Sequence, residues 1–323
     1  IFSGLLQELM EDRIRKGQQM MLFLNRRGYS NFISCRSCGE AVKCPHCDVT
    51  LTLHRDGRMV CHYCGYTMPK PVRCPNCGSS YIAGFGTGTQ KIQAMVEQRF
   101  PGVPTLRMDL DTTSKKGGHE EILSAFEHGE AQILIGTQMI VKGHDFPNVT
   151  LVGVLAADTS LYAPDFRCAE RTFQLLTQAA GRAGRDAEAG DVVIQTYAPD
   201  HYSIQAAAKQ DYAMFFEQEM AFRRMLQYPP VCGILTIQAA GRQEETVGQA
   251  ISQLKYWAEA EDGTVSIIGP ANAPIYKVND IYRKILYLKS ENYDILIKIR
   301  TRLEELWETA GFPNETSVQY DIT

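Results

Sequence analysis

Residues 35–77 read CRSCGEAVKCPHCDVTLTLHRDGRMVCHYCGYTMPKPVRCPNC and contain four Cys-x-x-Cys pairs, eight of the chain's ten cysteines. Each pair places two thiols on one tight turn, at the spacing that a zinc ion requires of its ligands. Disulfides and a thioredoxin-type redox pair are the alternatives, but a reducing cytosol disfavours the first and a redox enzyme needs only one pair. The stretch therefore predicts a zinc-binding module with two tetrahedral sites.

Four pairs can combine into two sites in three ways, and a turn signal selects one of them. Asp56-Gly57 lies between residues 49–53 and 58–60, and this dipeptide between two short strands is typical of a tight hairpin. The hairpin would fold the second cysteine pair onto the third, which predicts a nested arrangement. The inner site would be Cys44, Cys47, Cys61 and Cys64, and the outer site would be Cys35, Cys38, Cys74 and Cys77.

The module also carries a local excess of positive charge, in a chain whose formal net charge is −4. Between Cys35 and Cys77 the basic side chains outnumber the acidic ones by six to three. Such an excess suits contact with nucleic acid, although a solvated surface gives the same count. Nearby aromatic residues either stack on unpaired bases or pack the hairpin: Phe32, Tyr63 and Tyr66.

The remaining residues of metal-binding type are expected to have other roles. Because eight thiols are available, the three histidines of the module are expected at the surface or facing nucleic acid: His46, His54 and His62. Cys168 and Cys232 stand alone in the sequence and are expected as buried small apolar residues.

On both sides of the module the sequence predicts alternating strands and helices. Residues 19–24, QMMLFL, are a nearly continuous apolar run, typical of a strand buried on both faces of a parallel sheet. Later strands are expected at 81–83, 105–108, 132–135, 151–156 and 192–197, with helices near 91–100, 119–128 and 169–180. This alternation predicts an α/β lobe with a parallel sheet and helices on both faces, whose ligands lie at the carboxyl ends of the strands.

A long helix is expected from Tyr202 to about Leu226, and Pro229-Pro230 after it mark a domain boundary. Beyond the prolines, strands at 233–240, 265–268, 282–288 and 317–322 and helices at 245–259 and 293–310 follow a βαββαβ order, which predicts a small split-βαβ α+β domain. We therefore expect a discontinuous lobe at 1–34 and 79–228, a cysteine-rich insertion at 35–78 and a C-terminal domain at 229–323.

Three loops of the α/β part carry candidate ligand-binding residues. GFGTGTQ at 84–90 lacks the Gly-Lys-[Ser/Thr] of a P-loop, so Gly86, Thr87 and Gly88 either contact a nucleic-acid phosphate or form a flexible turn. IGTQMIVKGHDF at 135–146 brings hydroxyl, amide, cation and carboxylate groups to the end of a buried strand. QAAGRAGR at 178–185 ends a helix with two arginines, which helix capping or phosphoryl-transfer chemistry would explain; the flanking glycines favour the second.

These motifs, in this order, resemble the second RecA-like lobe of superfamily 2 DNA helicases. LFLNRRGY at 22–29 precedes the cysteine module, and GFGTGTQ, GTQMIVKGHDFP and QAAGRAGR follow it. An eight-cysteine insertion at that point is similar to the PriA family of primosomal replication-restart helicases, also called primosomal protein N′. MLQYPP at 225–230 fits the same family, and the resemblance covers essentially the whole chain.

The resemblance implies roles for individual residues. Arg182 and Arg185 would be arginine fingers, and Gln178 would belong to the same ATP-contacting motif. Residues implied at the nucleotide cleft are Gly143 and Asp145. Residues implied in contact with DNA are Thr137, Lys142, Arg26 and Arg27. In this family the cysteine module assists unwinding and partner loading, and the C-terminal domain resembles a nucleic-acid-binding ribosomal-protein-type fold.

The resemblance further implies an ATP-dependent 3′-to-5′ DNA helicase with ATP, Mg²⁺ and two Zn²⁺, acting in the bacterial cytoplasm and nucleoid at replication forks. Implied partners are branched or forked DNA, single-stranded DNA, primosome proteins, the machinery that loads the replicative helicase, and single-stranded DNA-binding protein. No P-loop and no Asp-Glu-x-His-type box occur in the sequence. We therefore expect a piece of a longer protein that cannot hydrolyse ATP unaided.

Two other interpretations stay open. The chain could be a non-catalytic, zinc-dependent module that binds DNA or primosome proteins, or its cysteines could only staple a small domain that lacks a core. Arg182 and Arg185 favour the motor, because a binding module has no use for them. No run of eighteen apolar residues and no secretory signal occur, so we expect neither a membrane helix nor export.

Overall fold

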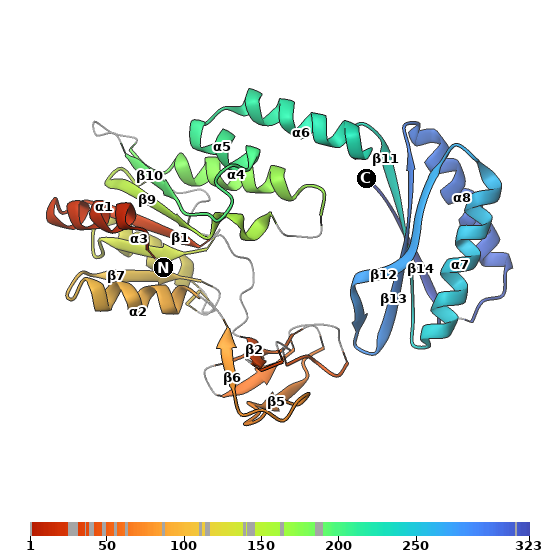
Figure 1. Ribbon diagram of the computed structural model, residues 1–323, viewed down its shortest axis with the longest axis horizontal. Coiled ribbons are helices and arrows are strands. Elements are labelled where there is room, and N and C mark those ends of the chain that lie inside the picture. Colours follow the sequence, from red (N-terminus) through yellow and green to blue (C-terminus); the bar gives the residue numbers. More distant parts are fainter. Residues whose placement is uncertain are drawn as a thin grey trace. The chain divides into compact units, whose positions relative to one another are not determined.

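A computed structural model gives the fold of the chain (Figure 1). The structure describes residues 2–24, 32–35, 37–38, 42–46, 50–54, 57–61, 64–85, 88–109, 112–113, 117–137, 140, 146–161, 165–184, 190–313 and 315–323. The chain divides into two compact units. Unit 1 comprises residues 1–29 and 86–219, and unit 2 comprises residues 30–85 and 220–323.

Unit 1 is built on a five-stranded parallel sheet. The strand order is β10 (Asp191–Ile194), β9 (Val149–Leu155), β1 (Gln19–Leu24), β8 (Ile133–Gly136) and β7 (Thr105–Met108). Every residue of β1, β8 and β9 is buried. A central parallel strand is apolar along its whole length because helices cover both of its faces. The apolar run at 19–24 therefore predicted its place in the sheet correctly.

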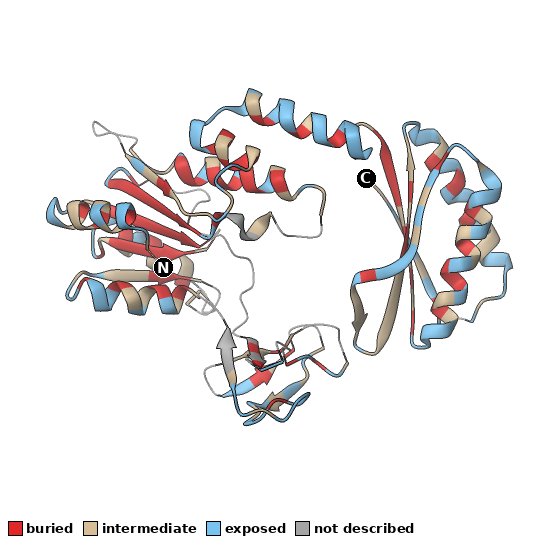
Figure 2. Ribbon diagram, in the orientation of Figure 1, coloured by how far each residue is buried: buried red, intermediate tan, exposed pale blue. Residues whose placement is uncertain are grey.

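Helices cover both faces of this sheet (Figure 2). On the first face lie α1 (Gly4–Arg15) and α2 (Thr89–Arg99), and on the second lie α3 (Gly118–Glu127), α4 (Cys168–Ala180) and α5 (Tyr202–Lys209). The short 3₁₀ helix η2 (Ala157–Ser160) follows β9. Alternate residues of β1 serve the two layers: Met20 and Leu22 pack in the first, Met21 and Phe23 in the second.

The helix expected from Tyr202 to Leu226 is broken in two, which corrects the prediction. After α5, Gln210 takes a left-handed φ of 52°, and α6 (Tyr212–Leu226) then begins. The Asp211 side chain accepts a hydrogen bond from the Met214 N–H at 2.9 Å, as an N-cap residue does. An aspartate at the start of an apolar helical pattern was the available signal, and helical periodicity alone missed it.

The cysteine module of unit 2 contains two small antiparallel sheets. One pairs β2 (Phe32–Cys35) with β6 (Ile82–Phe85), and the other contains β3 (Thr52–Leu53), β4 (Arg58–Val60) and β5 (Thr67–Pro69). The strand expected at 81–83 was placed in the parallel sheet, and this was wrong. The chain enters the module along one strand and leaves along the other, so adjacent antiparallel pairing satisfies the backbone groups of both.

The predicted hairpin is present in the module. Thr52 lies opposite Val60, Leu53 lies opposite Met59, and Gly57 has a φ of 78° that favours glycine. Asp56, the other turn residue, lies outside the described residues. A small core beneath the hairpin includes Ile33, Leu51 and Met59, all fully buried.

The C-terminal part of unit 2 has the predicted βαββαβ order. Its antiparallel sheet runs β12 (Ser266–Val278), β13 (Ile281–Ser290), β11 (Gly233–Gly241) and β14 (Ser317–Ile322), and α7 (Glu244–Glu261) and α8 (Tyr293–Thr309) pack on one face. β12 is much longer than the predicted 265–268. GPANAP at 269–274 is typical of a loop, but Ala271 and Asn272 pair with β13 between two register shifts, so the strand continues through this segment.

Among the helices of the described residues, none is long and apolar enough to cross a bilayer.

Candidate metal centre and ligand-facing loops

Four cysteines meet where the cysteine module begins and ends. β2 brings Cys35 and Cys38 beside the turn that carries Cys74 and Cys77, just before β6. The Sγ atoms of Cys35 and Cys77 are 3.5 Å apart, those of Cys38 and Cys74 are 3.7 Å apart, and all four lie within 4.8 Å of one another. A tetrahedral zinc with Zn–S bonds of about 2.3 Å separates its sulfurs by about 3.8 Å. The outer cluster therefore fits one zinc ion.

A second cluster forms around the hairpin. Cys44, Cys61 and Cys64 lie within the same 4.8 Å limit, and the Sγ atoms of Cys44 and Cys64 are 3.6 Å apart. Cys47, the fourth predicted ligand, lies outside the described residues. The structure thus brings seven of the eight cysteines together in the two groups that nested pairing requires. Zinc ligation itself stays a prediction.

Two glycines, Gly65 and Gly78, lie in the tight turns of the third and fourth Cys-x-x-Cys pairs. Gly65 N–H donates to the Cys61 carbonyl and Gly78 N–H donates to the Cys74 carbonyl, both at 2.9 Å, and both glycines have a positive φ. A side chain at either position would strain the turn that holds two thiols together.

Two thiols of the outer cluster have pKa values shifted in opposite directions. The backbone N–H groups of Cys38 and Ser37 lower the pKa of Cys35 to about 6. The Ser79 N–H lowers the pKa of Cys77, but the nearby Cys35 and Cys38 sulfurs outweigh it and raise that pKa to about 12. Adjacent negative charges oppose one another in this way, and a divalent cation removes the conflict.

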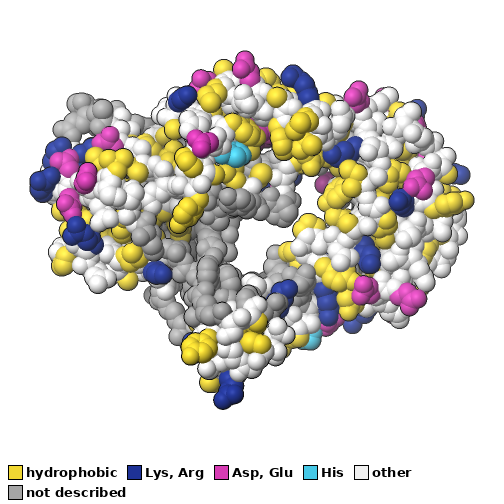
Figure 3. All heavy atoms as spheres, viewed as in Figure 1, with side chains coloured by type: hydrophobic (Ala, Val, Ile, Leu, Met, Phe, Trp, Pro, Cys, Tyr) yellow, Lys and Arg dark blue, Asp and Glu magenta, His cyan; other side chains and the backbone are white. Residues whose placement is uncertain are grey.

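Basic side chains lie at the surface of the module (Figure 3). Lys43, Arg58, Lys70 and Arg73 are exposed. Tyr66 packs against the hairpin core and meets the His46 ring edge-on at 5.4 Å, so packing is the interpretation that the structure favours for this aromatic residue. Tyr63 and His62 lie outside the described residues.

The two solitary cysteines are partly as expected. Cys232 is buried, and burial raises the pKa of its thiol. Cys168 is only half-buried at the start of α4, and burial raises its pKa as well. Neither has the lowered pKa of a reactive thiol.

Thr137 lies at the carboxyl edge of the parallel sheet. It follows the last residue of β8, Gly136, where an added Cβ would lie 2.9 Å from the Met108 carbonyl oxygen and would overlap Ile140. Only glycine fits this close approach, which fixes where the next residue lies. Lys142, Gly143 and Asp145 lie outside the described residues.

A partly buried polar network at the same edge was missed by the sequence interpretation. The Thr89 hydroxyl, at the start of α2, donates to the Asp109 carboxylate, which also accepts the Thr112 N–H at 3.1 Å and lies 3.4 Å from Arg107 Nε. Burial raises the pKa of Asp109, but these donors outweigh it and hold the pKa below its usual value. DLDTT directly after a predicted strand was the available signal.

The network anchors one of the predicted loops. Gly88 is the N-cap of α2, next to Thr89. Gly86 and Thr87 lie outside the described residues. Asp109 thus ties the end of the 84–90 loop to the end of β7, and the amino terminus of α2 lies at the carboxyl edge, where it can face an anion.

The arginine segment lies at the opposite edge of the sheet. α4 crosses back from the end of β9 to the start of β10, so its last turn, with Gln178, reaches the amino edge. There the Gly184 N–H donates to the carbonyl of Val149, the first residue of β9, at 3.0 Å. Gln178 is exposed and Arg182 is half-buried. Arg185, Arg26 and Arg27 lie outside the described residues.

This placement corrects the expectation that all ligand-facing loops share the carboxyl edge. That rule holds for loops that follow strands, and QAAGRAGR follows a helix, which runs antiparallel to them. Thr137 and Arg182 therefore face opposite ends of one sheet.

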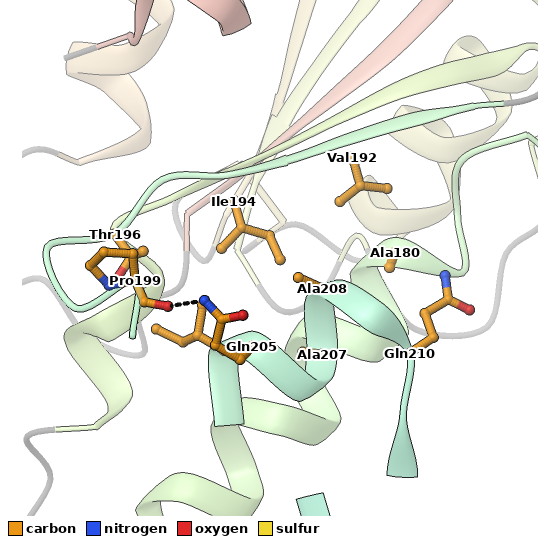
Figure 4. Close-up of a pocket in the computed structure, with 10 residues that line it drawn as sticks. Ala180, Val192, Ile194, Thr196, Pro199, Gln205, Ala207, Ala208 and Gln210 are labelled. Atoms are coloured by element: carbon orange, nitrogen blue, oxygen red, sulfur yellow. Dashed lines mark hydrogen bonds between the residues drawn. The ribbon is translucent and has the colours of Figure 1, made fainter. Parts of the chain in front are cut away.

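A cavity of about 300 Å³ lies beside the last turn of α4 (Figure 4). Its walls come from α4, β10, α5 and the segment between β10 and α5, and include Ala180, Ile194 and Ala207. Among the described residues that line it none is charged, and the Gln205 side-chain amide donates to the Pro199 carbonyl at 2.7 Å. These lining residues therefore offer no charged group to a phosphate.

Three protein families match consecutive parts of the chain. The PriA DNA helicase Cys-rich region (CRR) domain matches residues 44–69, the Helicase conserved C-terminal domain matches 82–187, and the Primosomal protein N C-terminal domain matches 224–322.

Three of the curated relatives are named Replication restart protein PriA. That of Bacillus subtilis is 50% identical over 285 residues, covering 88% of this chain and 35% of the relative. That of Synechocystis sp. is 44% identical over 328 residues, covering 100% and 39%. That of Chlamydia muridarum is 37% identical over 336 residues, covering 100% and 43%. The chain thus spans less than half the length of these relatives.

Proposed function

Because the chain belongs to the PriA family of replication restart proteins and matches their C-terminal part, we propose that it is part of an ATP-dependent 3′-to-5′ DNA helicase that restarts stalled replication forks. One observation carries this proposal: two nested cysteine clusters interrupt a parallel sheet between β1 and α2, and the lobe goes on to an arginine segment at the sheet's amino edge. We assign residues 1–34 and 79–228 to the second helicase lobe, 35–78 to the zinc module and 229–323 to the C-terminal domain.

We propose that the amino edge serves ATP. Arg182 and Arg185 would stabilise the charge that develops on the transferring phosphoryl group, with Gln178, Gly143 and Asp145 lining the same cleft. The sequence lacks the lysine loop and the acidic box that hold phosphates and Mg²⁺. The chain would therefore supply charge stabilisation to a site completed by another lobe, and would not hydrolyse ATP alone.

The carboxyl edge would serve the DNA backbone. The Thr137 hydroxyl and the start of α2 offer hydrogen-bond donors to phosphates, and the Asp109 carboxylate accepts a hydrogen bond from Thr89, next to the N-cap Gly88. Gly86, Thr87 and Gly88 would contact a phosphate of the DNA backbone. We propose Lys142, Arg26 and Arg27 as further phosphate contacts. If nucleotide binds at one edge of the lobe and DNA at the other, a movement of the lobe would couple nucleotide binding to DNA binding.

The cysteine clusters would hold two Zn²⁺ ions. The thiol spacing fits tetrahedral coordination, and metal binding would stabilise a module whose own core is small. Forked and single-stranded DNA, primosome proteins, the loading machinery for the replicative helicase and single-stranded DNA-binding protein are the proposed partners at replication forks in the cytoplasm.

Replacement of both arginines tests the motor assignment. In the full-length protein, Arg182→Ala with Arg185→Ala should lower DNA-stimulated ATP turnover by about a thousandfold or more, as loss of arginine fingers does, with fork binding largely retained. Arg300→Ala, on an exposed face of α8, is the matched control and should leave turnover unchanged. Turnover in the double variant equal to that of the control would refute the helicase proposal.

The second candidate is a non-catalytic DNA- or protein-binding module, which the exposed basic residues of the cysteine module favour. Charge reversal of Lys70 and Arg73 should weaken binding of fork DNA by this chain and reduce its salt dependence. A titration at two salt concentrations measures both effects. Affinities equal to that of the unchanged chain would remove this surface from DNA recognition.

A further inference from the structure

A tight turn of the C-terminal sheet reaches the inner cysteine cluster. β12 and β13 pair up to Val278 and Ile281, and the two residues between them, Asn279 and Asp280, have φ values of 50° and 59°. Two positive φ angles at the centre of a two-residue hairpin loop are typical of a type I′ turn, which asparagine and aspartate tolerate. The turn is therefore a compact projection with a defined backbone.

This turn contacts residues 44–46, which we name the inner knuckle. The Asp280 N–H donates to the His46 carbonyl at 3.0 Å, and the Asp280 carboxylate lies 2.7 Å from His46 Nδ1. Lys277 Nζ donates to the Pro45 carbonyl at 3.3 Å. Val278 packs on the module core that contains Cys44 and Cys61. The polar contacts thus reach Pro45 and His46, more than 200 positions away in the sequence, and the apolar contact reaches the module core beside them.

The residue that Asp280 contacts, His46, is also bonded to a predicted metal ligand, Cys44. The His46 N–H donates to Cys44 Sγ at 3.4 Å. Asp280 therefore contacts the side chain of the residue whose amide is hydrogen-bonded to this thiol. An N–H donated to a ligand sulfur favours the thiolate, and the groups that orient such donors tune metal affinity.

The outer cluster provides an internal comparison. There the Ser37 N–H donates to Cys35 Sγ, also at 3.4 Å, so the two knuckles have the same local design. The Ser37 hydroxyl, however, is hydrogen-bonded to Ser79 Oγ at 2.8 Å, just after Cys77 and in the same stretch of unit 2, residues 30–85. The outer knuckle, residues 35–37, is thus braced from within this stretch, whereas the inner knuckle is braced by the C-terminal domain.

We infer that Asp280 is a positioning residue for the inner zinc site, acting through His46 on Cys44. The coupling is reciprocal. If docking of the C-terminal turn raises the zinc affinity of the inner site, zinc at that site must strengthen docking of the turn by the same factor. The zinc affinity of the inner site should therefore depend on whether the C-terminal domain contacts the module, and the zinc affinity of the outer site should not. This inference rests on the proposed zinc binding.

The expected effect is moderate because the contact is partly exposed. The His46 and Asp280 side chains retain 43% and 49% of their accessible surface, so solvent screens the pair. Asp280→Asn keeps the turn and its backbone N–H but removes the carboxylate. We expect zinc affinity at the inner site to fall by about three- to tenfold, at the lower end of the effects of outer-sphere partners.

Competition for zinc against a chromophoric chelator measures both sites in the 323-residue chain. Asp280→Asn should weaken one of the two ions and leave the other unchanged, and Val278→Ala should affect the same ion. Asp321→Asn, the same charge change on the exposed edge strand β14, is the matched control and should alter neither. Asp280→Asn with both affinities equal to those of the control, or with both weakened alike, would overturn the inference.

Stoichiometry separates this failure from that of the proposed function. A chain that binds no zinc refutes the zinc proposal itself, whereas two ions with unchanged affinity in Asp280→Asn refute only the positioning role. The reciprocal effect is measured by hydrogen exchange of the Asp280 amide. Exchange should be faster in Cys64→Ser, which damages the inner cluster, than in Cys38→Ser, which damages the outer one. Equal rates in the two variants would contradict the coupling.

Discussion

Replacing Gly190 by alanine should displace the segment that carries Arg182. Gly190 begins the return of the chain into β10, and its Cα lies against the backbone of Ala183 and Gly184. A Cβ there would lie 2.5 Å from the Ala183 carbonyl carbon and 2.7 Å from the Ala183 Cβ, and closer still to the Gly184 nitrogen. Because carbon atoms in contact prefer about 3.5 Å or more, one segment must move by about 1 Å.

The magnitude follows from what that movement disturbs. The Gly184 N–H donates to the Val149 carbonyl at 3.0 Å, and a shift of that size breaks the bond. Overpacking and an unmade hydrogen bond each cost about 1–3 kcal/mol. We therefore expect a loss of about 2–6 kcal/mol in the stability of unit 1. In the full-length protein, a displacement of about 1 Å in a catalytic segment can lower turnover by up to about a hundredfold.

Two measurements on the chain test this reasoning. Hydrogen exchange of the Gly184 amide should be faster in Gly190→Ala, and urea should unfold unit 1 at a lower concentration. Gly4→Ala is the matched control, because an added Cβ there meets nothing within 4 Å and the position opens helix α1. If Gly184 exchanges at the unchanged rate and stability equals that of the control, the close approach at Gly190 does not hold the arginine segment in place.

Three other expected outcomes concern the rest of the molecule. Gly136→Ala should displace Thr137 and weaken DNA binding more than ATP turnover in the full-length protein, because the two edges serve different ligands; equal losses would contradict that division. Asp109→Asn should destabilise unit 1 by about 1–2 kcal/mol at neutral pH, since buried donors lose a charged acceptor. The folded-state pKa of Asp109 lies below its usual 3.8, so its contribution to stability is complete well above pH 4 and is lost as the pH falls below that value. The free energy of unfolding should therefore change less between pH 7 and pH 3 in Asp109→Asn than in the unchanged chain. Removal of zinc by a strong chelator should expose the amides of the 44–77 region to exchange while those of β1 stay protected, and loss of protection in β1 would refute independent stability of the parallel sheet.

Much of the fold follows from local sequence patterns. The run QMMLFL predicts a strand buried on both faces, because each face needs its own apolar residues, and β1 packs against helices on both sides. Asp56-Gly57 predicts a hairpin, because few residues adopt a positive φ without strain, and the hairpin is there. The C-terminal βαββαβ order is likewise local, since each element has its own period and stop signals.

Errors arose where a neighbour distant in sequence decides the outcome. β6 looks like another strand of the parallel sheet, but β2 offers it an antiparallel partner. GPANAP looks like a loop, but Ala271 and Asn272 pair with β13 and make the segment part of β12. The Asp109 network joins residues from α2, β7 and the loop after β7, and no spacing rule within any one of them predicts it.

The four Cys-x-x-Cys pairs show the same division. The sequence by itself determined that thiols come in pairs with metal-binding geometry, because two positions three apart on a tight turn are necessarily close. Only the tertiary structure decided that the inner knuckle is braced by Asp280 and the outer knuckle by Ser79, and that Thr137 and Arg182 face opposite edges of one sheet. Chain direction and long-range packing set these relations, and short-range residue patterns carry no information about either.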